Sequence, residues 1–153
     1  MKILKITIWV VLALFVILQF IPNTYPEVVK LNEHDLIQTG NVPDEIQRIL
    51  KSSCYDCHSN ETKYPWYAYI APVSWLVVRD VNKGRDELNF SEWDSLKSRE
   101  KIKLLDEIAE EVEEGNMPMP IYTVTHGEAS LDDSQKQILE EWTKEMMNDI
   151  LGE

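Results

Sequence analysis

Positive charge is scarce in this sequence: 15 Lys and Arg stand against 27 Asp and Glu in 153 residues, a net charge of −12. This balance argues against a phosphate-binding surface, and therefore against nucleic acid as a partner, and it favours a partner with a basic surface. Cysteine is scarcer still, and two residues cannot build a disulfide framework. No segment has a convincing strand pattern, so we expect an all-α protein.

The overall composition fits one globular domain, but the first 22 residues differ from the rest of the chain. Residues 6–21 carry no charge, and Lys2 and Lys5 precede them. With its flanking apolar residues, a helix here would span about 28 Å, so the sequence predicts a transmembrane helix. The positive-inside rule then predicts a single-pass cell-membrane protein, with a cytoplasmic N-terminus and the remainder in the periplasm or otherwise outside the cytoplasm. No small-residue cleavage site follows, which favours an anchor over a signal sequence.

Three segments follow from these patterns: a membrane anchor over residues 1–22, a tether over 23–42 and a small helical domain over 43–150. Pro43, with two acidic residues after it, predicts the start of a helix that carries both cysteines. Apolar periodicity predicts further helices near residues 72–82, ended by Gly84, and near 97–114 and 130–150. Residues 116–130 contain two prolines and a glycine, and such long loops are commonly functional.

Residues 54–58 read Cys-Tyr-Asp-Cys-His, the C-x-x-C-H pattern of c-type haem attachment. On a helix, Cys54 lies one turn from both Cys57 and His58, so the thiols can bond the two vinyl groups while the imidazole reaches the iron. The pattern therefore predicts one covalently attached haem c, with His58 as the proximal iron ligand.

Three other interpretations of the two cysteines remain open. A thioredoxin-type dithiol belongs in a βαβ context, which the sequence lacks. A zinc site needs four ligands, so both His34 and His126 would have to join the cysteines. A structural disulfide would leave His58 without a role.

The sixth iron position is expected to take a methionine or a histidine, as in other cytochromes of this type. Met117 and Met119 are the favoured candidates, because prolines in their loop fix the backbone and can direct a thioether. His126 and His34 are alternatives, and so is an open site. The other methionines near the C-terminus fit ordinary core positions.

The segments CYDCHSNETKYPWYAYIAPVSW, GR followed by NFSEW, and NMPMPIYTVTHGEASL, before a closing helix with a tryptophan, resemble the bacterial haem-binding domain family. The resemblance covers about residues 30–145 and implies a cytochrome c-like helical domain around a covalent haem. In that family the loop reads Met-Pro, then Pro, Tyr and His. This implies Met117 as the iron ligand, whereas Met119 occupies a position usually held by other residues.

Five aromatic residues follow the C-x-x-C-H pattern between residues 64 and 75, and they fit either plain core or the walls of a haem pocket: Tyr64, Trp66, Tyr67, Tyr69 and Trp75. Arg79 and Arg85 could pair with haem propionates or stay solvated. Four glutamates, Glu110, Glu111, Glu113 and Glu114, end the helix before the loop and would favour ferric iron and a basic partner.

We therefore expect a membrane-anchored monohaem cytochrome that transfers single electrons to and from a redox partner protein and is not an enzyme. The alternative is a haem-based sensor or small-ligand-binding module with an open or exchangeable sixth site. A peroxidase-like enzyme is least favoured, because His126 alone offers a distal acid–base group.

Overall fold

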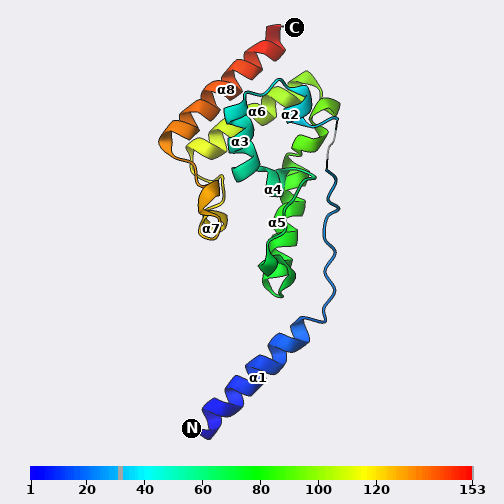
Figure 1. The fold of residues 1–153 in the computed structure, drawn as a ribbon, viewed down its shortest axis with the longest axis vertical. Coiled ribbons are helices and arrows are strands. Elements are labelled where there is room, and N and C mark those ends of the chain that lie inside the picture. Colours follow the sequence, from blue (N-terminus) through cyan, green and yellow to red (C-terminus); the bar gives the residue numbers. More distant parts are fainter. Residues whose placement is uncertain (31–32, 153) are drawn as a thin grey trace.

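The computed structural model describes residues 1–30 and 33–152, and every regular element in those two stretches is helical (Figure 1), which confirms the all-α expectation for them. In chain order the elements are α1 (Lys2–Leu18), α2 (Leu36–Thr39), α3 (Asp44–Ser53), α4 (Tyr55–His58), η1 (Trp66–Tyr69), α5 (Val73–Glu87), η2 (Phe90–Ser95), α6 (Ser98–Glu113), α7 (Pro120–Thr123), η3 (Gly127–Ala129) and α8 (Asp133–Gly152).

The transmembrane helix predicted within residues 1–22 is wrong. α1 projects away from the other helices (Figure 1) and has 17 residues, which span about 26 Å against the ~30 Å of a bilayer's hydrocarbon core. The uncharged run continues to Ile21, but Gln19 caps the helix and exchanges hydrogen bonds of 3.1 and 3.0 Å with the backbone of Ala71. Among the helices of the described residues, none is both long and apolar enough to cross a membrane. The predicted single-pass location rested on that span and is corrected with it.

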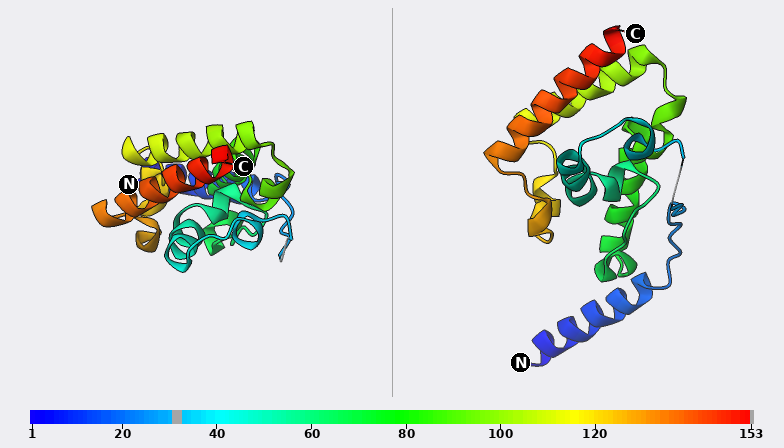
Figure 2. Two further views of the ribbon diagram at one scale, coloured as in Figure 1. Left: turned by 90° about the horizontal axis from the view of Figure 1, so that it is seen from above. Right: turned by 45° about the horizontal axis from the view of Figure 1, so that its top comes forward.

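The core lies between α3, η2, α6 and α8. α6 and α8 run side by side in both views of Figure 2 and share more contacts than any other pair of elements. α3 begins after Pro43 and buries the apolar face that the sequence predicts. Most of the buried apolar residues form one cluster, which consists of Leu36, Val42, Ile46, Ile49, Leu50, Tyr55, Phe90, Trp93, Leu105, Val112, Leu139 and Trp142.

Gly84 does not end α5, as the sequence suggested, but lies within it. A Cβ atom at this position would be 2.7 Å from the carbonyl oxygen of Cys57 and 3.1 Å from its Cβ. Glycine is therefore required for a steric reason, since α5 and α4 approach each other here more closely than a side chain allows. This contact places the residues after Cys54 directly against α5.

The segment predicted as a tether lies along α4, α5 and η1, apart from residues 31–32, which fall outside the described residues. Its backbone receives hydrogen bonds at Pro26 from Tyr64 (3.3 Å) and at Glu27 from Arg85 (2.9 Å), and the amide of Val29 donates to Asn60 (2.8 Å). α2 follows, capped by the buried carboxylate of Asp35. These contacts join the segment before α3 to α5 and to the residues between α4 and η1.

Candidate functional site

The C-x-x-C-H residues form a single tight turn, which we call the motif turn (residues 54–58). Cys54 ends α3 and begins α4, and its carbonyl oxygen accepts hydrogen bonds from the amides of Cys57 (3.1 Å) and His58 (2.9 Å). The turn thus has the one-turn separation between Cys54 and both later residues that helical spacing predicts.

Both thiols of the motif turn are free, and both cysteines are half-buried. Burial raises the pKa of Cys54 from 9.0 to about 12 and, reinforced by Asp56 and Asp80, the pKa of Cys57 to about 11. Redox-active C-x-x-C motifs of the thioredoxin type lower a thiol pKa instead, because the thiolate is the reactive form. The two thiols here remain protonated at neutral pH, which does not fit an activated dithiol.

The imidazole of His58 is held in the form that binds a metal. Its Nδ1 lies 3.2 Å from the carbonyl oxygen of Leu88, and because a carbonyl only accepts, Nδ1 carries the hydrogen and Nε2 keeps its lone pair. Burial lowers the pKa of His58, so the ring is neutral at pH 7. Phe90 lies beside it, with ring centroids 6.5 Å apart.

Three neighbouring cavities surround the motif turn. The central cavity, of about 70 Å³, is lined by Asp56, Cys57, His58, Met117, Met119 and Tyr122 among others. The apolar cavity, of about 520 Å³, extends from Cys57 and Met119 along α5 past Val73, Leu76 and Val77. The acidic-rimmed cavity, of about 680 Å³, is lined by Cys54, His58, Leu104, Ile108 and Met117. Its charged lining residues are mostly acidic: Asp86, Glu87, Glu107, Glu110 and Glu111 against Lys83 and Lys103. The two cysteines therefore line different cavities, and His58 lines one cavity with each of them.

The two candidate methionines lie on different sides of the central cavity. Met117 lines the same two cavities as His58, the central and the acidic-rimmed one, and packs against the core. Met119 lines the central and the apolar cavity, together with Cys57. Both belong to what we call the methionine loop (residues 116–122), which follows the end of α6 at Gly115, a glycine with a φ of 76°.

The other two histidines lie outside the lining of these cavities. His126 stacks on Tyr122 with ring centroids 4.2 Å apart, and its ring nitrogens are 3.4 Å from the hydroxyl of Tyr67. His34 is exposed and pairs with Asp94 at 3.5 Å. No group of three or more His, Cys, Asp or Glu side chains suited to a metal ion occurs in the described part of the chain, so the zinc interpretation lacks its ligand set.

Only some of the aromatic residues predicted as pocket walls line a cavity in the structure. Tyr64 and Tyr67 line the apolar cavity, whereas Trp66 is 76% exposed and Trp75 is half-buried away from all three cavities. Arg79 also lines the apolar cavity and pairs with Asp80 at 2.7 Å.

Two residues of this site were not singled out from the sequence. Tyr122 lines the central and apolar cavities, and its hydroxyl donates a hydrogen bond of 2.8 Å to Asp56 in the motif turn. The position of Asp56 between the cysteines and the tyrosine of the family's loop pattern were the available signals, but neither indicates that the two side chains meet.

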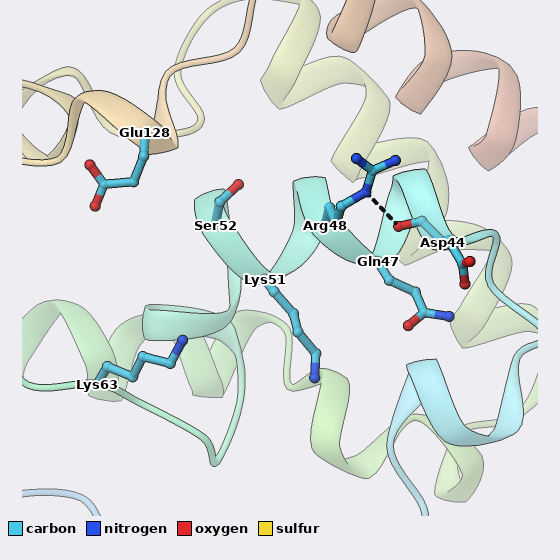
Figure 3. Close-up of a pocket in the computed structure, with 7 residues that line it drawn as sticks. All are labelled: Asp44, Gln47, Arg48, Lys51, Ser52, Lys63 and Glu128. Atoms are coloured by element: carbon cyan, nitrogen blue, oxygen red, sulfur yellow. Dashed lines mark hydrogen bonds between the residues drawn. The ribbon is translucent and has the colours of Figure 1, made fainter.

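A larger hollow of about 780 Å³ lies on the outer side of α3, and its lining is entirely polar or charged (Figure 3). It contains Arg48, Lys51 and Lys63 together with Asp44 and Glu128, and Arg48 donates to the Asp44 carbonyl at 3.3 Å. None of the cysteines, His58 or the methionines lines it. This hollow therefore does not suit an apolar macrocycle.

A comparison with known protein families supports a haem site at the motif turn. A family model described as "Haem-binding domain" matches residues 13–145, most of the chain. The chain belongs to the haem-binding domain family. No curated protein and no solved structure matches it. It therefore binds haem, and the resemblance drawn from the sequence is confirmed.

The residues around the motif turn fit a haem. The apolar cavity offers aliphatic and aromatic walls, and the central cavity places an imidazole and two thioethers near each other. The apolar and acidic-rimmed cavities, though not the small central one between them, have volumes within the roughly 300–1,000 Å³ of ordinary cofactor pockets. Two protonated thiols, one before and one after Tyr55 and Asp56, suit a ring with two reactive substituents. Cys54, Cys57, His58 and the methionine loop are thus the residues that would hold it.

Proposed function

We propose that this protein is a monohaem c-type cytochrome, in which Cys54 and Cys57 hold the haem covalently and His58 and Met117 ligate its iron. The observation that carries the proposal is the motif turn, whose two cysteines line neighbouring cavities that a neutral imidazole also lines. When bound, the haem supplies a one-electron Fe(III)/Fe(II) couple. The protein transfers single electrons and carries out no substrate chemistry of its own.

Covalent attachment needs only the two thiols. Each sulfur would form a bond to one carbon of a vinyl group while its hydrogen goes to the other carbon, so no oxidant or reductant is consumed. The protonated state of Cys54 and Cys57 is compatible with this addition. Two such bonds would fix the ring beside His58, so retention of the haem would not depend on the bond between the imidazole and the iron.

Methionine as the sixth ligand is supported by the lining of the cavities. Met117 shares both of its cavities with His58, whereas Met119 shares one and His126 shares none. A thioether ligand favours ferrous iron and raises the reduction potential. The glutamates around the acidic-rimmed cavity act in the opposite direction and favour a redox partner with a basic surface.

The ligand assignment is tested by replacing each methionine in the holoprotein. We expect Met117→Ala to abolish the near-infrared methionine-to-ferric-iron band, because the thioether that faces the iron is lost. Met119→Ala is the matched control, two residues away in the same loop, and should retain the band. Loss of the band in Met119→Ala alone would reverse the assignment.

The same protein distinguishes electron transfer from ligand sensing. With both axial positions filled, the untreated ferrous protein should bind carbon monoxide slowly or not at all, and its absorption should titrate as one reversible one-electron step. Rapid carbon monoxide binding by the untreated protein would instead favour a haem-based sensor with an exchangeable sixth site.

A further inference from the structure

The two residues between the cysteines, Tyr55 and Asp56, each bind a distant part of the chain through a hydrogen bond between a tyrosine hydroxyl and a carboxylate. Tyr55 donates to the buried carboxylate of Asp35 at 2.8 Å, which joins the turn to α2. Asp56 accepts from the hydroxyl of Tyr122 at 2.8 Å, which joins the turn to α7. The bonds have the same chemistry and length, but only the second reaches the segment that carries the methionines.

Asp56 is fixed from a second side. Its Oδ1 accepts from the amide of Lys63 at 3.1 Å, while its Oδ2 accepts from Tyr122. Burial, with the neighbouring carboxylate, raises the pKa of Tyr122, so its hydroxyl stays protonated and remains a donor. Each oxygen of the Asp56 carboxylate therefore has its own donor, and the Lys63 amide orients the carboxylate independently of Tyr122.

The methionine loop has two attachment points, one at each end. At its start, the amide of Met117 donates to the carbonyl of Glu111 in the last turn of α6 at 3.0 Å. At its end, the amide of Tyr122 donates to the carbonyl of Met119 at 2.9 Å, and the Tyr122 hydroxyl reaches Asp56. Both methionines lie between α6 and the motif turn, so the bond to Asp56 fixes how closely their loop can approach His58.

We propose that Asp56 and Tyr122 are positioning residues whose hydrogen bond holds the methionine loop against the motif turn and thereby keeps a methionine on the iron. The inference rests on the proposed function, because it assumes a haem ligated from that loop. It assigns a role to Asp56, which lies between the cysteines, and to Tyr122, whose hydroxyl is hydrogen-bonded to Asp56 and not to a thiol or to the imidazole.

The test is Tyr122→Phe in the holoprotein, which removes the hydroxyl and retains the ring that stacks on His126. We expect the methionine-to-iron band to weaken or vanish and carbon monoxide to bind the ferrous protein at least about tenfold faster, since a hydrogen bond to a charged group is lost. In the same holoprotein variant, amide hydrogen exchange across residues 116–126 should rise by a similar factor.

The matched control is Tyr55→Phe, which removes the equivalent hydroxyl from the bond to Asp35. It should leave the band and carbon monoxide binding as in the unmodified protein, even if it lowers stability. Asp56→Asn is the second variant: its single amide oxygen can serve either Tyr122 or Lys63, so the same changes are expected at smaller size.

The outcomes separate the inference from the proposed function. If the unmodified protein holds no covalent haem, the proposed function fails. If it holds one and has the band, but Tyr122→Phe keeps the band, unchanged carbon monoxide binding and unchanged exchange, the inference is overturned and the function stands. A covalent haem without a methionine band in the unmodified protein would also overturn the inference.

Discussion

At the scale of single residues, the two thiols of the motif turn are the groups whose chemistry the fold changes most clearly. Both are half-buried, Cys54 against the core and Cys57 against α5, and each has a folded-state pKa above the ordinary thiol value of 9.0. The thioredoxin interpretation required the opposite shift. Burial, with nearby carboxylates in the case of Cys57, thus favours cysteines that are protonated at neutral pH.

These shifts predict an alkaline loss of stability in the protein without haem. Unfolding lets the thiols release protons above pH 9, so the stability they contribute is complete below about pH 9 and falls as the pH rises toward 11 to 12. Urea unfolding at pH 7 to 11 should show this fall, and Cys54→Ala/Cys57→Ala should show less of it. The holoprotein should also show less, because thioethers do not ionise; equal slopes in all three forms would contradict the assignment.

At the scale of elements, the sequence predicted the start of α3 after Pro43 and the end of α6 near Gly115, because each helix has an apolar face and a clear boundary signal. The single helix predicted to carry both cysteines is wrong, because the chain breaks at Cys54 into α3 and α4. The sequence also misplaced the end of α5, because Gly84 was interpreted as a terminator when its function is a close helix contact. It extended α1 too far, because an uncharged run does not reveal that Gln19 binds Ala71. Such contacts depend on tertiary neighbours, which periodicity does not encode.

The close contact at Gly84 gives a prediction for the packing of α4 on α5. Gly84→Ala places a methyl group 2.7 Å from the carbonyl oxygen of Cys57, a backbone atom that cannot turn aside. We expect unfolding free energy to fall by about 1–3 kcal/mol and the motif turn to shift. Urea unfolding measures the loss.

Gly127→Ala is the control for that experiment. No heavy atom of the described chain lies within 4 Å of a Cβ at Gly127, so the change should stay within about 0.5 kcal/mol. Equal losses from both substitutions would show that the contact with Cys57 carries no particular strain.

At the scale of the whole molecule, the acidic residues that give the net charge of −12 do not all lie beside the cavities around the motif turn. Of the four glutamates that end α6 and its cap, Glu110 and Glu111 line the acidic-rimmed cavity with Cys54, His58 and Met117, whereas Glu113 and Glu114 do not. The sequence indicated the cluster but not this division, because the angle of α6 to the motif turn follows from packing.

This division predicts unequal effects on the reduction potential. Glu110→Gln/Glu111→Gln should raise the midpoint potential, because carboxylates near the iron stabilise its ferric form. Glu113→Gln/Glu114→Gln removes the same charge farther from the cavity and should raise it less. Spectroelectrochemical titration of both variants checks this, and equal shifts would contradict a local effect.

Covalent attachment of haem through Cys54 and Cys57 is the central claim, and an alkaline pyridine haemochrome spectrum tests it most directly. After acidic solvent extraction of free haem, the purified protein should give a c-type spectrum with one haem per chain, and Cys54→Ala/Cys57→Ala should give none. A b-type spectrum, or haem that leaves entirely with the solvent, would contradict the account.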